Sequence, residues 1–238
     1  MKISFVTLFP HAVLAAVRHS ILKRAEDAGI VAFEAVDIRD FASDRHRTVD
    51  DTPLGGGPGM VLKPDVVGRA LDTLQSTQAE YVFTDPSGPL FTQNSARELA
   101  EKKNLVFVCG HYEGIDDRVV TRFGMRRYSI GDFVLTGGEL PAAVMADAIV
   151  RLIPGVLGSA ESLREDAFAD GLLSYPQYTR PVTWEGLSTP EVLLSGDHGA
   201  IAKWRRKQRL ETTRKNRADL FSRAPLSKAD LDLLGDQR

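Results

Sequence analysis

The sequence of 238 residues predicts an α/β fold with a mainly parallel sheet, followed by a small, mostly helical C-terminal domain. Short β-rich runs alternate with helical patterns through the first 150 residues, an alternation that is typical of parallel sheets. The pattern changes near Pro154, where a long segment of mixed Gly, Ser, Glu and Asp residues begins. Beyond Pro181 the pattern becomes mostly helical.

Each expected element follows from a local pattern of apolar residues. The expected strands are Ile3–Leu8, Val31–Ile38, Tyr81–Thr84, Leu105–Cys109 and Arg127–Ile130. The helical stretches expected with them are Ala12–Ala28, Pro64–Leu74, Ser95–Lys102, Asp116–Arg122 and Leu140–Ile153. Nearer the C-terminus, helices are expected at Ile201–Arg217 and Leu226–Leu234. Ser227 and Asp230 lie three residues apart, which is the spacing of a helix cap.

These elements predict three parts of the chain. Residues 1–157 are expected to form the α/β domain and residues 158–175 a connecting linker. Residues 176–238 are expected to form the helical domain. Connecting segments of this length are often functional.

Composition limits the classes of protein that the chain can belong to. The single cysteine, Cys109, excludes an intrachain disulfide and a multi-cysteine zinc site, and its apolar surroundings favour a buried thiol over a reactive one. No run of about 18 apolar residues is present to span a membrane. The N-terminus reads as a strand without a secretory cleavage pattern. A cytoplasmic protein without membrane contact is therefore expected.

The charge is unevenly distributed along the chain. The formal net charge is −2, yet Asp197–Arg223 holds nine Lys and Arg residues and three Asp and Glu residues, a local charge of +6. A basic segment in an otherwise acidic chain favours contact with a polyanion such as RNA. Charge alone leaves a solvated helical face as an equal alternative.

Four glycine-bearing loops are candidate ligand sites. Gly55–Gly59 matches neither the dinucleotide-binding nor the P-loop pattern, and we interpret it as a shaped loop in preference to a mobile turn. Thr84–Gly88 and Cys109–Gly114 follow apolar strands, and Ser129–Pro141 precedes a helix. Ligands of parallel sheets bind where loops leave the carboxyl ends of strands, so these loops predict a ligand crevice.

The Ser129–Pro141 loop is the richest of the four. Its exposed backbone N–H and C=O groups can hydrogen-bond an adenine edge, and Ile130, Val134 and Leu135 can supply apolar walls. The five histidines show no metal-ligand spacing, so no structural zinc is expected.

Two charged residues near the expected linker have two interpretations each. Arg151 is either a cation favoured by a helix C-terminus or a catalytic residue. Asp166 is either a solvated loop acid or a catalytic one. Spacing alone does not decide between these interpretations.

Several motifs together resemble the bacterial tRNA (guanine-N1)-methyltransferases of the TrmD family. They are Thr48–Asp51 with Gly55–Met60, Cys109–Asp116, Ser129–Pro141, Ile153–Gly158 and Tyr178–Pro181. They occur in the family's order at family-like spacing and cover essentially the whole chain. Several long motifs in one order are far more specific than a single glycine loop.

The resemblance implies a particular architecture. The family belongs to the SPOUT-type methyltransferases, so the α/β domain is expected to contain a deep trefoil knot near Cys109 and the Ser129–Pro141 loop. Neither composition nor periodicity predicts a knot, and knots are rare. The resemblance also implies a homodimer with an active site shared between subunits, and a helical domain that contacts tRNA.

The implied reaction is methyl transfer from S-adenosylmethionine to N1 of the guanosine at tRNA position 37, preceded by another guanosine. N1 carries a proton in neutral guanine, so a general base must remove it. By resemblance, Asp166 is that base. Arg151 matches the catalytic arginine and would stabilise the charge that spreads to O6.

The resemblance also assigns the binding residues. For the cofactor they are Phe83, Gly110, Tyr112, Glu113, Ser129, Ile130, Gly131, Asp132, Phe133, Val134, Leu135, Gly137 and Pro141. A carboxylate at Glu113 suits the α-ammonium group of the cofactor. Guanine contacts are expected at Pro58, Gly59 and Ser174. No protein metal ligand is expected, and the magnesium dependence of the family leaves a role for Mg²⁺ open.

Some positions depart from the family pattern. Phe83 and Phe133 stand where relatives often carry tyrosine, which keeps stacking but removes a hydroxyl. Ser174 and Gln177 replace an acid and a histidine found in some members. The serine matters more, because the resemblance implies that the acid helps to recognise the guanine.

Two rival functions are kept as alternatives. A knotted methyltransferase acting on a ribose 2′-hydroxyl would explain the pairing of Arg151 with a linker carboxylate less directly. A non-catalytic RNA-binding protein using Asp197–Arg223 would bind RNA in a salt-sensitive way without a cofactor, and it leaves Ser129–Pro141 unexplained. We therefore expect a tRNA (guanine-N1)-methyltransferase.

Overall fold

The computed structural model describes residues 1–74, 78–158 and 166–235. The chain divides into two compact units, Met1–Gly158 and Ser159–Arg238, and each is described by itself. Part of the expected linker, residues 159–165, lies outside the described residues.

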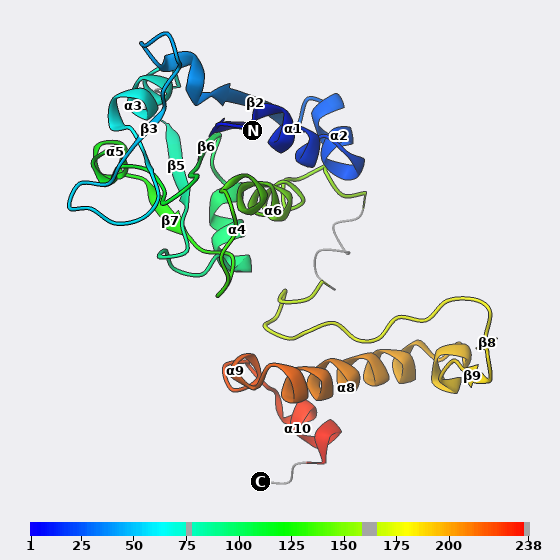
Figure 1. Ribbon diagram of the computed structural model, residues 1–238. Coiled ribbons are helices and arrows are strands. Elements are labelled where there is room, and N and C mark those ends of the chain that lie inside the picture. The colour runs from blue at the N-terminus through cyan, green and yellow to red at the C-terminus, as the bar shows by residue number, and fades with distance from the viewer. Residues whose placement is uncertain (75–77, 159–165, 236–238) are drawn as a thin grey trace. The chain divides into compact units, whose positions relative to one another are not determined.

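The first unit is built on a five-stranded parallel sheet (Figure 1). Its strands are β1 (Lys2–Thr7), β2 (Ala32–Asp37), β5 (Ala79–Thr84), β6 (Asn104–Cys109) and β7 (Arg126–Tyr128). Their spatial order is β2-β1-β6-β5-β7, and every neighbouring pair is parallel. The predicted α/β class and the positions of the five strands are confirmed.

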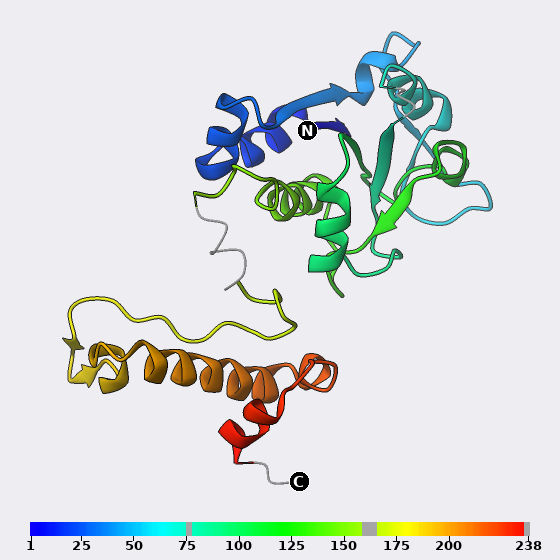
Figure 2. The same ribbon diagram turned by 180° about the vertical axis from the view of Figure 1, so that it is seen from behind.

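Helices cover both faces of this sheet (Figures 1 and 2). One face packs against α1 (Pro10–Val17), α2 (Ser20–Asp27), α4 (Gln93–Ala100) and α6 (Glu139–Val150). The other face packs against α3 (Pro64–Asp72), α5 (Asp117–Phe123) and the short helix η1 (Ile38–Phe41).

Strand β6 shows how the two cores form. Leu105 and Phe107 belong to the core beneath α4 and α6, whereas Val106 and Val108 belong to the core beneath α3 and α5. Successive side chains of a strand point to opposite faces, so a strand covered on both sides must be apolar throughout. This explains the continuous apolar runs in the sequence.

The structure differs from the sequence prediction between residues 12 and 28. The prediction of one helical stretch there was wrong, because the chain turns at Arg18 and His19 and forms two helices. Arg18 donates to the Glu26 carboxylate at 3.1 Å and to the Phe33 carbonyl at 2.7 Å. These bonds hold the turn against the following helix and strand.

Four short strands were absent from the prediction: the hairpin strands Thr183–Trp184 and Leu187–Ser188 of the second unit, and two in the first unit. β3 (Asp50–Asp51) and β4 (Val61–Leu62) pair antiparallel and bracket the Gly55–Gly59 loop. Strands of two residues are too short to show a period-two pattern, so only tertiary pairing reveals them. The loop is therefore anchored at both ends.

The second unit contains a hairpin and several helices. The hairpin strands are β8 (Thr183–Trp184) and β9 (Leu187–Ser188), followed by η2 (Glu191–Leu194). The helices are α8 (His198–Asn216), α9 (Ala218–Phe221) and α10 (Lys228–Leu234). The predicted cap of the last helix is confirmed, since Ser227 and Asp230 each accept a hydrogen bond from the other's backbone N–H.

Candidate active site

Loops that follow β5, β6 and β7 meet at the carboxyl ends of these strands. The Gly138 amide donates to the Gly110 carbonyl at 2.8 Å, which joins the Ser129–Pro141 loop to the loop after β6. The Phe91 amide donates to the Ser129 carbonyl at 2.7 Å, which joins the same loop to the loop after β5. The predicted meeting of the glycine-bearing loops is confirmed for these three.

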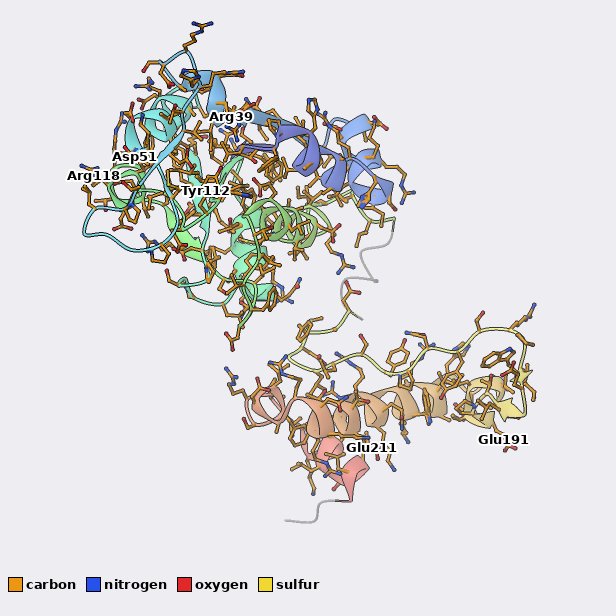
Figure 3. All side chains as sticks on the ribbon, viewed as in Figure 1. Arg39, Asp51, Tyr112, Arg118, Glu191 and Glu211 are labelled. Atoms are coloured by element: carbon orange, nitrogen blue, oxygen red, sulfur yellow. The ribbon has the colours of Figure 1, made fainter. Side chains whose placement is uncertain are left out.

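These loops enclose a cavity of about 460 Å³. It is lined by Phe83–Ser87, Gly110–Ile115, Asp117, Arg127–Gly131, Phe133–Gly138 and Pro141. One of the lining residues, Tyr112, is labelled in Figure 3. Its backbone has a φ of 57°, in the left-handed region, so the loop turns sharply at this residue.

The structure brings together nearly all of the residues predicted to bind the cofactor. All of them line the cavity except Asp132. The Phe133 amide donates to the Gly131 carbonyl at 3.0 Å, so the chain reverses tightly around Asp132, and its side chain is exposed. Gly131 and Phe133 therefore line the cavity, whereas Asp132 between them does not.

Large apolar side chains are exposed at the cavity. The exposed fractions are 86% for Val134, 54% for Phe133 and 39% for Leu135. Exposed apolar groups of this size on a loop are typical of a ligand site. Backbone polar groups of the same loop lie beside them.

The Gly55–Gly59 loop reaches the rim of the cavity. The Glu113 amide donates to the Met60 carbonyl at 3.0 Å. A Cβ atom at Gly59 would lie 2.4 Å from Glu113 Oε1, so no larger residue fits there without movement. Gly59 thus contacts one of the predicted cofactor-binding residues, and Pro58 adjoins it in the chain.

Sequence reasoning missed an ion-pair group in the cavity wall. Arg127 pairs with Asp85 at 3.4 Å and also with Asp117, and its guanidinium lies 5.9 Å from the ring centre of Phe83. These residues come from three separate segments. The positions of Asp85 after a strand, of Arg127 within a strand and of Asp117 at a helix start could be predicted from the sequence, but their pairing could not.

A second missed group lies between the cavity and β1. Glu139 accepts a hydrogen bond from Thr7 Oγ1 at 2.6 Å, and its other oxygen lies 3.9 Å from His111 Nδ1. That nitrogen is buried and has no hydrogen-bond partner among the described residues. The contacts place Glu139, at the start of α6, against both β1 and the loop after β6.

The other predicted site residues lie in different parts of the chain. Arg151 caps the C-terminus of α6 in the first unit, and its amide donates to the Asp147 carbonyl at 3.2 Å. Asp166 and Ser174 belong to the second unit. Asp166 is partly buried, and its backbone carbonyl accepts a hydrogen bond from the Ala169 amide at 3.3 Å. Ser174 is exposed.

Cys109 is buried at the end of β6, as predicted. Burial raises the pKa of its thiol well above the ordinary value, and the nearby Glu139 carboxylate acts in the same direction. A neutral buried thiol is a poor nucleophile. The structure therefore supports a packing role.

The described residues contain neither a cluster of metal ligands nor a membrane-spanning helix. No three His, Cys, Asp or Glu side chains in the described part of the chain gather closely enough to hold a metal ion. No helix within residues 1–74, 78–158 and 166–235 has the length and apolar character needed to cross a membrane.

The fold and this site define a class of protein. It is an α/β protein with a parallel sheet whose strand-end loops enclose a cavity suited to a small, partly apolar ligand. The family model described as tRNA (Guanine-1)-methyltransferase TrmD matches residues 1–223, and the chain belongs to this family.

Three relatives illustrate the similarity, and each is named tRNA (guanine-N(1)-)-methyltransferase. The protein of Staphylococcus haemolyticus is 52% identical, with 97% of this chain and 94% of the relative covered. That of Chloroflexus aggregans is 51% identical, with 99% and 95% covered. That of Dictyoglomus turgidum is 49% identical, with 98% and 95% covered.

Proposed function

We propose that this chain transfers a methyl group from S-adenosylmethionine to N1 of the guanosine at position 37 of tRNA, where another guanosine precedes it. The observation that carries the proposal is the cavity at the ends of β5, β6 and β7, in a member of the TrmD family. The names of the relatives support the acceptor atom and the kind of RNA.

The residues of the cavity fit the proposed methyl donor. Gly110 leaves space beside Phe83, because a Cβ atom there would lie 3.0 Å from Phe83 Cε2. The exposed Val134 and Leu135 can contact an adenine ring, and the Glu113 carboxylate can pair with an α-ammonium group. When bound, the cofactor supplies an electrophilic methyl group on a sulfonium.

Two side chains carry the proposed proton and charge chemistry. Asp166 accepts the proton of guanine N1, because the neutral base lacks a free lone pair there. Arg151 donates hydrogen bonds to guanine O6, where negative charge accumulates as the proton leaves. Ser174, Pro58 and Gly59 are the proposed guanine contacts. This chemistry requires the methyl donor, guanine N1 and the Asp166 carboxylate to be aligned. It assigns no protein ligand to Mg²⁺.

We also propose a trefoil knot and a homodimer whose subunits share each active site. Membership of the TrmD family supports the knot, whose proposed position is the Ser129–Pro141 segment; this segment bonds to both neighbouring loops through the Gly138 amide and the Ser129 carbonyl. Exposed apolar residues support a subunit interface, with exposed fractions of 62% for Leu140, 54% for Val144 and 44% for Phe9. Such a patch marks an interaction surface.

The experiment that tests the function uses two tRNA transcripts that differ only at position 37. With labelled S-adenosylmethionine, the transcript with guanosine is expected to accept the methyl group and the transcript with adenosine is not. Nuclease digestion and mass spectrometry then identify the methylated atom. Transfer to both transcripts, to neither, or to a ribose hydroxyl would reject the proposal, and a parallel reaction with EDTA tests the role of Mg²⁺.

A further inference from the structure

A second cavity lies wholly within the second unit. It has a volume of about 480 Å³ and lies between the extended segment 175–182 and one side of α8. From α8 it is lined by Ile201, Trp204 and Arg205, which are spaced for one face of a helix. No residue of the first cavity belongs to it.

The wall of this cavity is aromatic. The rings of Tyr178 and Trp204 lie 6.2 Å apart at an angle of 60°. A third ring, Tyr175, lies 5.0 Å from the Arg205 guanidinium carbon. Tyr178 is 48% exposed, so its ring remains accessible from outside the protein.

The cavity is also positively charged. Arg180 and Arg205 line it, and no Asp or Glu does. Glu191 on η2 and Glu211 on α8, which Figure 3 labels, are both outside the lining. Within the described residues, Arg205 Nε is buried and has no hydrogen-bond partner.

Two other arginines of α8, Arg206 and Arg209, form ion pairs within the second unit. Arg206 binds the carboxylates of Asp170 and Asp230, each at 2.6 Å. Arg209 also binds Asp170. Those guanidinium groups hold the unit together, whereas neither cavity arginine has a carboxylate partner among the described residues.

We propose that this cavity binds one unpaired nucleotide of the tRNA substrate. Aromatic rings beside unpaired guanidinium groups are the combination that binds single-stranded nucleic acid, because the base stacks and the phosphate pairs with arginine. The volume is sufficient for one base and its sugar. The identification of the RNA as tRNA rests on the proposed function, and the stacking chemistry is independent of it.

Fluorescence of Trp204 provides a direct test. The chain has two tryptophans, so Trp184→Phe leaves Trp204 as the only one. A single-stranded RNA hexamer is expected to quench its emission to saturation in the full-length protein. Arg205→Ala and Tyr178→Ala are each expected to raise the Kd by about tenfold, since a stacked base contributes about that much.

The matched control is Lys228→Ala, which removes an exposed positive charge of the same unit outside the cavity. A change of less than about twofold is expected there, because one exposed charge contributes little. Equal losses in all three variants, no quenching by RNA, or equal quenching by a glutamate-rich peptide would overturn the proposal.

Methyl transfer to the tRNA transcript separates this inference from the proposed function. Arg205→Ala is expected to raise KM with little change in kcat, because the cavity holds a part of the RNA that does not react. Quenching without any methyl transfer by the parent protein would reject the function and support the cavity. Methyl transfer with no effect of Arg205→Ala on KM or quenching would reject the cavity alone.

Discussion

At the scale of single residues, close backbone approach determines which side chains the site tolerates. Gly138 joins the Ser129–Pro141 loop to β5 and β6 at a point where almost no space remains. A Cβ atom there would lie 2.3 Å from Thr84 Oγ1 and 2.8 Å from Cys109 Cα. One of these atoms is backbone, so the neighbours cannot simply rotate away.

We predict that Gly138→Ala destabilises the first unit by about 1–3 kcal/mol, as overpacking does. It is also expected to raise the Kd for the cofactor about fivefold or more, since a distortion of the loop that costs binding about 1 kcal/mol corresponds to that factor. Denaturant unfolding and calorimetric titration with S-adenosylmethionine measure the two effects.

Gly158→Ala is the control for this substitution. A Cβ atom at Gly158 would meet no atom of the described residues within 4 Å, so the free energy of unfolding should change by less than about 0.5 kcal/mol. Wild-type stability and binding in the Gly138 variant would show that the loop has room to move.

At the scale of elements, the second unit depends on a charged group between helices. Arg206 on α8 binds Asp170 and Asp230, and Asp230 also caps α10 through the Ser227 amide at 2.9 Å. Asp230 is only 5% exposed. The Asp230 carboxylate therefore accepts a hydrogen bond from the backbone at the start of α10 and also pairs with Arg206 of α8.

We predict that Asp230→Ala lowers the stability of α10 by about 2–3 kcal/mol, because it removes a cap and leaves Arg206 with one partner fewer. Hydrogen exchange at the α10 amides measures the loss locally. Asp232→Ala, an exposed change on the same helix, should alter it by less than about 0.5 kcal/mol. Equal effects of both changes would contradict this role.

The ion pair between Arg206 and Asp230 makes the stability of the second unit depend on pH. The hydrogen bond from Arg206 holds the pKa of Asp230 well below its ordinary value, with a further contribution from the Ser227 amide. A lowered pKa means that the unfolded chain binds the proton more readily, so the stabilisation is complete above about pH 5 and is lost as pH falls through the unfolded and then the folded pKa. Asp230→Asn should remove this part of the acid sensitivity.

At the scale of the whole molecule, the proposed catalytic pair is divided between the two compact units. Arg151 lies at the end of α6 in the first unit, and Asp166 lies in the second. A homodimer with shared sites would combine an arginine from one subunit with an aspartate from the other. Complementation between two inactive variants tests this arrangement.

We predict that Arg151→Ala and Asp166→Ala each keep cofactor binding and lose nearly all methyl transfer. Mixed and re-associated, the two variants should recover about a quarter of wild-type activity, because half of the dimers would then contain one intact site of two. If both residues of each site came from one subunit, mixing would restore nothing. Full activity in Asp166→Ala alone would refute its role as the base.

Much of the fold was predictable because local physical rules determine it. Apolar runs such as Leu105–Cys109 located the strands, and the spacing of Ser227 and Asp230 located a helix start. The break at Arg18 was missed because side-chain bonds to Glu26 and Phe33, distant along the chain, stabilise it. Long-range contacts of this kind leave no periodic signal.

The α/β class, the five strands of the parallel sheet and the loops that supply the site could be predicted from the sequence, because these follow from periodicity, glycine positions and family motifs. Tertiary packing was needed to establish which residues of those loops face the cavity, as the exclusion of Asp132 shows. It also decided the pairing of Arg127 with Asp85 and Asp117, and the gathering of Tyr175, Tyr178 and Trp204 around a second cavity. These depend on distances between segments far apart in the chain, which only the packing of the sheet, its helices and α8 establishes.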